Sequence, residues 1–290
     1  MSTIAACYVC GNSASDLICE ISTGAIVRCL DCGVVYRQSV ITGDDYERLY
    51  QNDATMETPF YLTNKLASDP NKEPMPTYAR GLAKLNELVK PGRLLDVGCS
   101  YGAFMEMARY AGWQVMGVEL NTSTAKFARE QRGFDVFNGM IEEAKFPDAS
   151  FDAVTLWDVI EHLDDPVRTL KEIHRILAPN GVIFVFTINQ QSLLNTVGHL
   201  MYRVTMNRWK HLMELFYDIH HNFFFSPKTI TEVLRRGGPF AVEEIMFGAA
   251  NVSRWHTVPI SKLMISGSDA IDKVAQPLNR SYRMFVYARK

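Results

Sequence analysis

The stretch Leu94–Gly102, which reads LLDVGCSYG, contains the pattern that decides the fold. Its mostly apolar first half predicts a buried strand, and the glycines that follow predict a tight turn into a helix. Because Gly98 and Gly102 lack side chains, a ligand can approach the backbone and meet N–H groups at the start of the helix. The spacing Gly-x-x-x-Gly differs from the dinucleotide motif Gly-x-Gly-x-x-Gly, so the loop alone leaves the ligand open.

Strands and helices are predicted to alternate around this motif, which is the signature of a mostly parallel sheet. Strands are expected at 94–97, 115–118, 135–137, 153–157 and 182–187, with closing strands at 241–247 and 284–288. Helices are expected at 77–89, 103–111, 122–131 and 166–177. We therefore predict an α/β fold with a Rossmann-like, doubly wound, mostly parallel sheet of seven strands.

A carboxylate at the end of the second predicted strand indicates a nucleoside ligand. Glu119 follows Gly98 by 21 residues, the separation expected when one helix and one strand intervene. Such a side chain can accept hydrogen bonds from both hydroxyls of a ribose. A carboxylate that interacts only with the dipole of the following helix is the alternative, and the glycine loop upstream favours ribose binding.

Four of the six cysteines form two pairs near the N-terminus, Cys7-x-x-Cys10 and Cys29-x-x-Cys32. A glycine follows each pair, so two tight turns can place four thiolates around one Zn²⁺. Two disulfides in a secreted protein are the alternative, which the lack of a signal-like segment at the N-terminus disfavours. Four thiolates fill the coordination shell, so we expect a structural zinc site.

The chain has 290 residues, which leaves room for a small module beside one large domain. We expect a zinc-ribbon-like module over 1–40, a linker or cap over 41–76, and an α/β domain over 77–290 with a lid-like insertion near 188–225. The net charge of -2 shows no basic excess for nucleic acid. Apolar runs such as 182–186 are too short to cross a membrane. We therefore expect a cytoplasmic protein with neither nucleic acid nor a membrane as its partner.

Five stretches make the chain resemble the class I methyltransferases, which use S-adenosylmethionine. They are LLDVGCSYG (94–102), GVEL (117–120), FPDASFD (146–152), DVIEHL (158–163) and RILAPNG (175–181). They occur in the order and at the spacing of that family and cover roughly residues 78–190. The resemblance implies S-adenosylmethionine as the cofactor.

The resemblance also implies which residues line the cofactor site. Asp96 and Gly98 would line the methionine end of the cofactor, and Glu119 would bind its ribose. The turn 139–141 would flank the adenine, where many relatives carry an acidic residue and this chain carries Met140. Ser100 replaces the usual second glycine of the loop. The full set is Asp96, Gly98, Cys99, Ser100, Gly102, Glu119, Leu120, Met140, Ile141 and Trp157.

Four polar residues are candidates for chemistry on the methyl acceptor. Asp158, Glu161 and His162 would share one face of a helix, and His221 is a further candidate. Two carboxylates and one or two imidazoles suit Mg²⁺, Mn²⁺ or another divalent cation. The set resembles two groups of metal-dependent methyltransferases, the O-methyltransferases of ubiquinone biosynthesis and the small-RNA 2′-hydroxyl methyltransferases.

An alternative interpretation gives these four polar residues roles that involve no metal. Asp158 would then cap a helix, Glu161 would complete a capping box, and His162 or His221 would act as a general base or fill a polar niche. The apolar residues of the insertion would either wall an acceptor pocket or, by default, pack as core. They are Tyr202, Met206, Trp209, Met213, Leu215, Phe216, Tyr217 and Phe223–Phe225.

Together these observations predict a methyltransferase that O-methylates a hydroxyl of a small molecule such as a sugar or secondary metabolite. An RNA methyltransferase that docks through the zinc ribbon is an alternative. The ribbon contributes only Arg28 and Arg37 as cations, a poor footprint for phosphates. A third hypothesis is a cofactor-binding protein without catalysis, whose zinc module contacts another protein.

Overall fold

A seven-stranded sheet with the order β12-β13-β10-β9-β6-β7-β8 forms the centre of the protein. β6 to β10 run parallel, whereas β13 lies antiparallel between β10 and β12. The strands are β6 (Arg93–Val97), β7 (Gln114–Glu119), β8 (Asp135–Asn138), β9 (Phe151–Trp157), β10 (Leu177–Ile188), β12 (Ala241–Gly248) and β13 (Arg283–Arg289). Each predicted strand lies within an observed one, so the doubly wound, mostly parallel sheet is confirmed.

This computed structural model describes residues 2–3, 6–22, 24–40, 75–205, 213–214, 216–217, 220–248 and 262–290. The predicted linker or cap over 41–76 lies almost entirely outside the described residues, as do Met206, Trp209 and Leu215 of the insertion. Among the described residues, no helix is both long and apolar enough to span a membrane.

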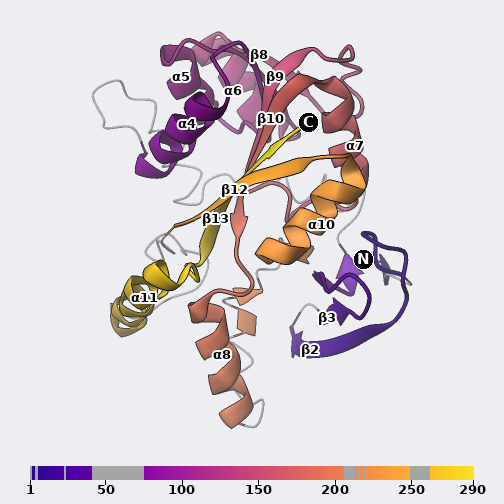
Figure 1. Ribbon diagram of the computed structural model, residues 1–290, viewed down its shortest axis with the longest axis vertical. Coiled ribbons are helices and arrows are strands. Elements are labelled where there is room, and N and C mark those ends of the chain that lie inside the picture. The colour runs from indigo at the N-terminus through magenta and orange to yellow at the C-terminus, as the bar shows by residue number, and fades with distance from the viewer. Residues whose placement is uncertain are drawn as a thin grey trace.

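Helices cover both faces of the sheet (Figure 1). α4 (Pro76–Leu88), α5 (Ala103–Tyr110) and α6 (Thr122–Arg132) lie on one face, and α7 (Pro166–Ile176) and α10 (Pro227–Gly237) lie on the other. The sequence sets these boundaries locally. Asn121 caps α6 by accepting a hydrogen bond from the backbone N–H of Thr124, and Gly133 ends it in a left-handed conformation. α8 (Leu193–Val204) and α11 (Lys262–Ala275) extend away from the sheet.

The N-terminal module contains more strands than the two that the sequence predicts. β2 (Ser15–Ile21), β3 (Gly24–Cys29) and β4 (Val35–Arg37) form an antiparallel sheet. Its fourth strand is β11 (Phe223–Phe224), which comes from the end of the insertion and pairs with β4. The prediction missed β4 because a three-residue strand has too little alternation to detect, and its partner lies far along the chain. Two further short strands, β1 (Ser2–Thr3) and β5 (Ser39–Val40), pair with each other.

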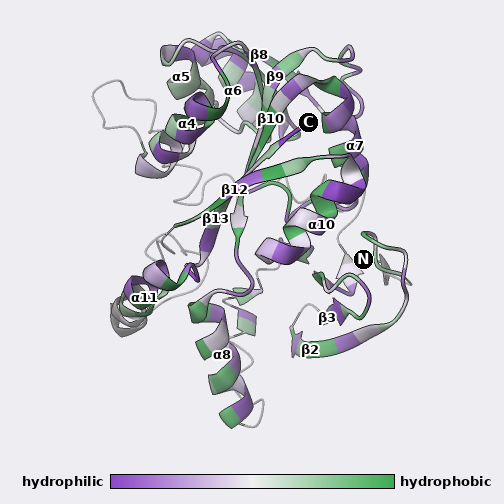
Figure 2. Ribbon diagram, viewed as in Figure 1, coloured by the Kyte–Doolittle hydropathy of each residue, from purple (hydrophilic) through white to green (hydrophobic). Residues whose placement is uncertain are grey.

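One continuous hydrophobic cluster joins the module to the central sheet. It includes Val27 and Tyr36 of the module together with Leu95 and Val154 of the sheet. Phe223, at the end of the insertion, belongs to the same cluster. Figure 2 shows the apolar residues concentrated along the central strands, and Figure 1 shows the module beside α10. The module and the α/β domain therefore stabilise each other by burying shared apolar surface.

The insertion over 188–225 packs largely as core where it is described. Tyr202, Phe216 and Tyr217 are at most 5% exposed and lie in one cluster with Cys19 and Ile26 of the module. This packing agrees with the default expectation for these aromatic residues. The lid-like role of the insertion stays a prediction.

The packing of α10 on α7 predicts a strong effect of one methyl group. A Cβ atom on Gly237 would lie 2.2 Å from Cβ of Leu170. We expect Gly237→Ala to lower the free energy of unfolding by about 1–3 kcal/mol, because the helices must move apart. Gly267 in α11 is a matched control, since a Cβ there meets no atom of the described residues within 4 Å. Gly267→Ala should leave stability unchanged or raise it, and equal denaturation midpoints for both variants would contradict this account.

Candidate active site

A pocket opens where the parallel strands β6, β7 and β9 end. In open α/β sheets, ligands bind at this carboxyl edge. The lining includes nine of the ten predicted cofactor residues, namely Asp96, Gly98, Cys99, Ser100, Glu119, Leu120, Met140, Ile141 and Trp157. Gly102 lies outside this lining. It precedes α5 with φ 79°, and a Cβ there would lie 3.1 Å from the ring of Phe134, so a side chain would be both strained and crowded at this position. The contact of Gly102 with the cofactor stays a prediction.

Gly98 and Ser100 of the glycine loop have a left-handed backbone conformation that most residues avoid. Gly98 has φ 71°, and a Cβ on it would lie 2.5 Å from Val159. Ser100 has φ 51°, so the serine that replaces the usual glycine occupies the left-handed region. The Ser100 hydroxyl is buried and has no hydrogen-bond partner among the described residues. The loop therefore presents its backbone to a ligand, with no side chain at Gly98 in the way.

The carboxylate of Glu119 ties this loop to the neighbouring strand end. Its Oε2 accepts a hydrogen bond from the backbone N–H of Ser100 at 2.7 Å, and its Oε1 accepts one from Asn121 at 2.8 Å. Burial raises the pKa of Glu119, and these N–H groups oppose that shift. Because each oxygen has two lone pairs, the carboxylate can also accept hydrogen bonds from ribose hydroxyls.

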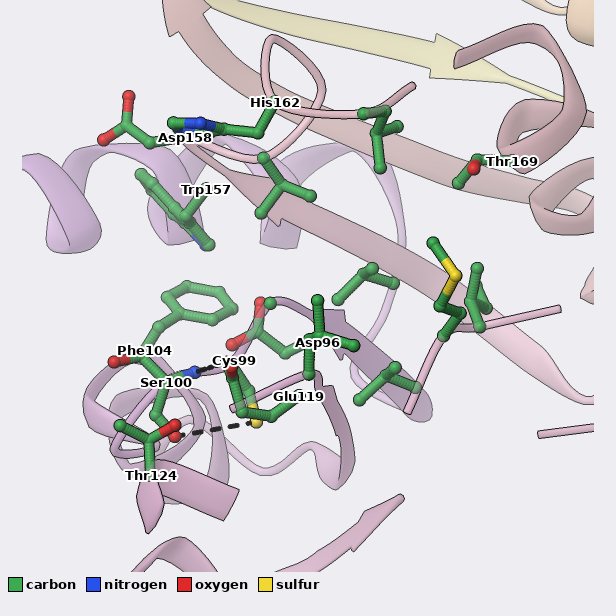
Figure 3. Close-up of a pocket in the computed structure, with 18 of the residues that line it drawn as sticks. Asp96, Cys99, Ser100, Phe104, Glu119, Thr124, Trp157, Asp158, His162 and Thr169 are labelled. Carbon is green, nitrogen blue, oxygen red and sulfur yellow. Dashed lines mark hydrogen bonds between the residues drawn. The ribbon is translucent and has the colours of Figure 1, made fainter. Parts of the chain in front are cut away.

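Asp96 brings a second buried acid into the pocket. Its Oδ1 accepts a hydrogen bond from the Thr155 hydroxyl at 2.6 Å. The pKa of Asp96 is raised to about 7, mainly by burial and also by the charge of Glu119, while the Thr155 hydrogen bond opposes the shift. Figure 3 shows Asp96 between Glu119 and Ser100 on one side and Trp157 and His162 on the other. A cation in the pocket would favour the ionised form of Asp96.

Aromatic rings form one wall of the pocket. The ring centroid of Trp157 lies 4.7 Å from that of Tyr78 and 4.9 Å from that of Phe104. Tyr78 and Phe104 line the pocket but were not predicted as site residues. They lie in α4 and α5, where the sequence gives only the apolar spacing of ordinary helices, so no signal separated them from core residues.

The segment after β9 is a turn, and the predicted helix is wrong. Asp158 has φ 52°, and α7 begins only at Pro166, with Asp165 as its N-cap. Proline favours the first position of a helix, which explains the later start. The alternative in which Asp158 caps a helix and Glu161 completes a capping box is wrong for the same reason.

The structure nevertheless brings three of the four predicted residues together. Glu161, His162 and His221 offer metal-ligating atoms that all lie within 4.8 Å of one another. The ring centroids of His162 and His221 are 4.6 Å apart. Asp158 instead forms an ion pair with Arg283 and lies outside this group. Both Asp158 and His162 also line the pocket, so the group borders the cofactor site.

Glu161 is fully buried, and neither of its carboxylate oxygens has a partner of normal hydrogen-bond geometry among the described residues. Its pKa is raised to about 8, mainly by burial and also by the charge of Asp158, while Arg283 opposes the shift. A buried carboxylate is costly unless it is neutral or paired. Together with two imidazoles, these oxygens form a ligand set that fits a divalent cation.

The four N-terminal cysteines also form a cluster, with their sulfur atoms within 4.8 Å of one another. The Sγ atoms of Cys7 and Cys32 are 3.7 Å apart, and those of Cys10 and Cys29 are 3.4 Å apart. Zn–S bonds of about 2.3 Å would place the sulfurs of a tetrahedral site roughly 3.8 Å apart. All four thiols are unbridged, so the alternative of two disulfides is not what the structure contains.

Comparison with known proteins identifies the family. Residues 72–244 match the family model described as "Methyltransferase domain". The chain belongs to this methyltransferase family. This membership supports the predicted enzyme class, a methyltransferase that depends on S-adenosylmethionine, and supports S-adenosylmethionine among the predicted cofactors. The zinc ion and the divalent cation stay predictions.

Curated relatives of the methyltransferase include ubiquinone biosynthesis O-methyltransferases. The protein from Idiomarina loihiensis is 38% identical over 104 residues, which are 34% of this chain and 43% of that protein. The protein from Ruegeria pomeroyi is 30% identical over 151 residues, which are 50% of this chain and 59% of that protein. The matched part of the methyltransferase thus spans about half the length of these relatives.

Solved structures share the fold of the methyltransferase. A SAM-dependent methyltransferase from Archaeoglobus fulgidus superposes with a TM-score of 0.54 at 20% identity, covering 80% of this chain and all of that one. The [4+2]-cyclase SpnF gives a TM-score of 0.55 at 19% identity, covering 87% of this chain and 98% of that one. At these identities the likeness shows the fold alone.

The raised pKa of Asp96 predicts how cofactor binding depends on pH. Because folding raises this pKa, the protonated form favours the folded state, and that contribution is lost as the pH rises through about 7. A cationic cofactor favours the ionised form. Titration calorimetry should therefore show the affinity of the methyltransferase for S-adenosylmethionine falling roughly tenfold from pH 7 to pH 5.5.

The variant Asp96→Asn provides the control for this pH dependence. It cannot ionise, so its affinity should be weaker at pH 7 and nearly constant over the same range. The comparison also cancels any titration of the cofactor itself. Identical pH profiles for Asp96→Asn and the wild type would contradict a role for the Asp96 carboxylate.

Proposed function

We propose that this methyltransferase transfers the methyl group of S-adenosylmethionine to a hydroxyl of a small molecule, with help from a divalent cation. Glu161, His162 and His221 would hold the cation. The observation that carries the proposal is the fully buried carboxylate of Glu161, which has no hydrogen-bond partner of normal geometry among the described residues and lies beside two imidazoles at the edge of the cofactor pocket. The names of the curated relatives, ubiquinone biosynthesis O-methyltransferases, support a hydroxyl as the acceptor.

In this proposal the cofactor lies along the pocket in the order that its lining suggests. Glu119 binds the ribose hydroxyls, and Met140 and Ile141 flank the adenine. Asp96 faces the methionine end, next to the aromatic wall of Trp157. The sulfonium makes the methyl group electrophilic, so the protein mainly has to align the acceptor oxygen with it. The aromatic wall helps by excluding water from the reacting atoms.

His162 is suited to meet the acceptor because its ring is already oriented. Its Nδ1 lies 2.9 Å from the backbone oxygen of His220, so Nδ1 carries the hydrogen and Nε2 carries the lone pair. Nε2 can then ligate a metal or take a proton from the acceptor hydroxyl. When bound, a divalent cation would lower the pKa of a coordinated hydroxyl. We assign Asp158, which lines the pocket, to hold Arg283 through an ion pair.

The burial of Arg37 disfavours RNA as the acceptor. Of the two cations that the module offers, Arg28 is exposed, whereas Arg37 is fully buried. A single exposed cation supplies little of the counterion release that drives binding to RNA. A small molecule such as a sugar or another secondary metabolite remains our proposed acceptor.

We also propose that Cys7, Cys10, Cys29 and Cys32 hold a structural Zn²⁺. Gly11 and Gly33 follow the second cysteine of each pair with φ 77° and 75°. Their N–H groups donate to the carbonyls of Cys7 and Cys29 at 2.7 and 3.1 Å, which closes the two turns around the sulfurs. Four thiolates leave no open position for catalysis at this site.

The proposed activity predicts methyl transfer that depends on the cation. We would incubate the protein with labelled S-adenosylmethionine and a host extract, then separate metabolites from RNA. Label should enter the metabolite fraction, be lost after EDTA and return with Mg²⁺ or Mn²⁺. Glu161→Gln should lower the rate by about a hundredfold or more, because it removes the charged ligand. His199→Ala is the control variant. His199 lies outside the cluster, where it forms a hydrogen bond with the hydroxyl of Tyr217, so this variant should retain activity.

Each contrary result removes a different part of the proposal. Label in RNA would contradict the small-molecule acceptor. Transfer that resists EDTA and survives Glu161→Gln would contradict the cation and leave His162 or His221 as a general base. Measuring zinc in the EDTA-treated protein shows whether chelation also reached the four cysteines.

The zinc proposal predicts loss of metal and stability in Cys29→Ser. Elemental analysis should show about one Zn²⁺ per wild-type chain and none in the variant, whose melting temperature should fall by several degrees because zinc binding supplies folding free energy. Cys19→Ser is the matched control, since Cys19 is buried in the same module outside the cluster. Cys29→Ser with unchanged zinc content and melting temperature would contradict the proposal.

A further inference from the structure

Arg37 is a cation of the N-terminal module that the fold buries completely. It is the last residue of β4, three residues before the end of the described part of the module, and it is 0% exposed. Burying a guanidinium is costly unless hydrogen bonds compensate for the lost water. The cost indicates that this side chain has a specific task in the folded protein.

The contacts of Arg37 lead to the candidate metal cluster. Its backbone N–H donates to the carbonyl of Asn222 at 2.9 Å, which continues the pairing of β4 with β11. Its guanidinium Nε donates to the carbonyl of His221 at 3.3 Å. The module therefore holds the backbone of His221, a proposed ligand, through the side chain of Arg37, and the backbone of the adjacent Asn222 through the main chain of Arg37.

Asn222 and Phe223, which follow His221, form hydrogen bonds with the backbone of the other two proposed ligands. The backbone N–H groups of Asn222 and Phe223 both donate to the carbonyl of Glu161, at 2.8 and 3.0 Å. The side-chain amide of Asn222 donates to the carbonyls of His162 and Leu163 at 2.9 and 3.2 Å. The turn that contains Glu161 and His162 is thus fixed against the same short segment that Arg37 holds.

We propose that Arg37 is a positioning residue for the cluster of Glu161, His162 and His221, so that the cysteine module forms a working part of the active site. The inference rests on the proposed function of that cluster. A backbone ladder between β4 and β11 would form with many residues at position 37. The Nε donor of a guanidinium is specific to arginine, and it holds the carbonyl of His221 in addition to the ladder.

The test compares Arg37→Met and Arg37→Lys with Arg28→Met in the full-length protein. Arg28 lies in the same module, on β3, and is exposed, so its replacement controls for loss of charge. Affinity for Mn²⁺ is measured by electron paramagnetic resonance, and zinc content, melting temperature and affinity for S-adenosylmethionine are measured beside it. Hydrogen exchange of a peptide covering 220–225 reports the amides of Asn222 and Phe223 independently of any bound metal.

We expect both Arg37 variants to bind Mn²⁺ about tenfold more weakly, the effect typical of residues that orient metal ligands. Exchange over 220–225 should become faster. Arg37→Lys keeps the charge and should retain its zinc and its affinity for S-adenosylmethionine, which separates positioning from misfolding. Arg28→Met should behave as the wild type in every measurement.

Two results would overturn the proposal. In the first, the Arg37 variants lose melting temperature but keep wild-type Mn²⁺ affinity and exchange, which a purely structural role would produce. In the second, Arg28→Met weakens Mn²⁺ as much as Arg37→Lys, which would show a general effect of charge. If the wild type itself binds no Mn²⁺, the proposed metal function fails instead. The exchange of 220–225 in Arg37→Lys then decides the positioning role: faster exchange supports it, and unchanged exchange contradicts it.

Discussion

The arrangement of the active site depends on one constraint, namely that neighbouring parallel strands all end at the same edge of the sheet. Asp96 lies near the end of β6, Glu119 at the end of β7 and Trp157 at the end of β9. These residues are far apart in sequence, yet the register of β6 against β7 and β9 leaves them around one pocket. The antiparallel pairing of β13 closes the same sheet and places Arg283 beside Asp158.

The second constraint at this edge of the sheet is electrostatic, because several acidic side chains are buried there. The pocket and its border contain Asp96, Glu119 and Glu161, three acids that burial pushes toward their neutral forms. Within the described part of the chain, backbone N–H groups compensate Glu119, whereas Asp96 has a single hydroxyl donor. Glu161 has no such donor of normal geometry among the described residues. The least compensated acids therefore lie where a cationic methyl donor and a divalent cation would add positive charge, and binding and local stability are linked.

Much of the α/β domain could be predicted because its signals are local. Every strand of the central sheet was expected from a short apolar run, and Gly133 marked the end of its helix. Local reasoning failed at 158–163, where helical spacing suggested a shared face but the chain makes a turn before Pro166. Glu161, His162 and His221 still lie close together, as predicted, because the segment leading into β11 brings His221 to the turn from a distant part of the chain. Spacing cannot reveal such contacts, and it also gave no sign of Tyr78 and Phe104 in the pocket wall.

The pairing of β11, from the insertion, with β4 of the module has a consequence for folding during synthesis on the ribosome. β4 emerges early, but β11, which covers its free edge, is translated only after most of the chain has been made. Until then the nascent module exposes an unpaired strand, a feature that promotes wrong association with other chains. Early capture of a metal by the four cysteines would fold the two turns ahead of that moment and keep the edge ordered while it waits for its partner.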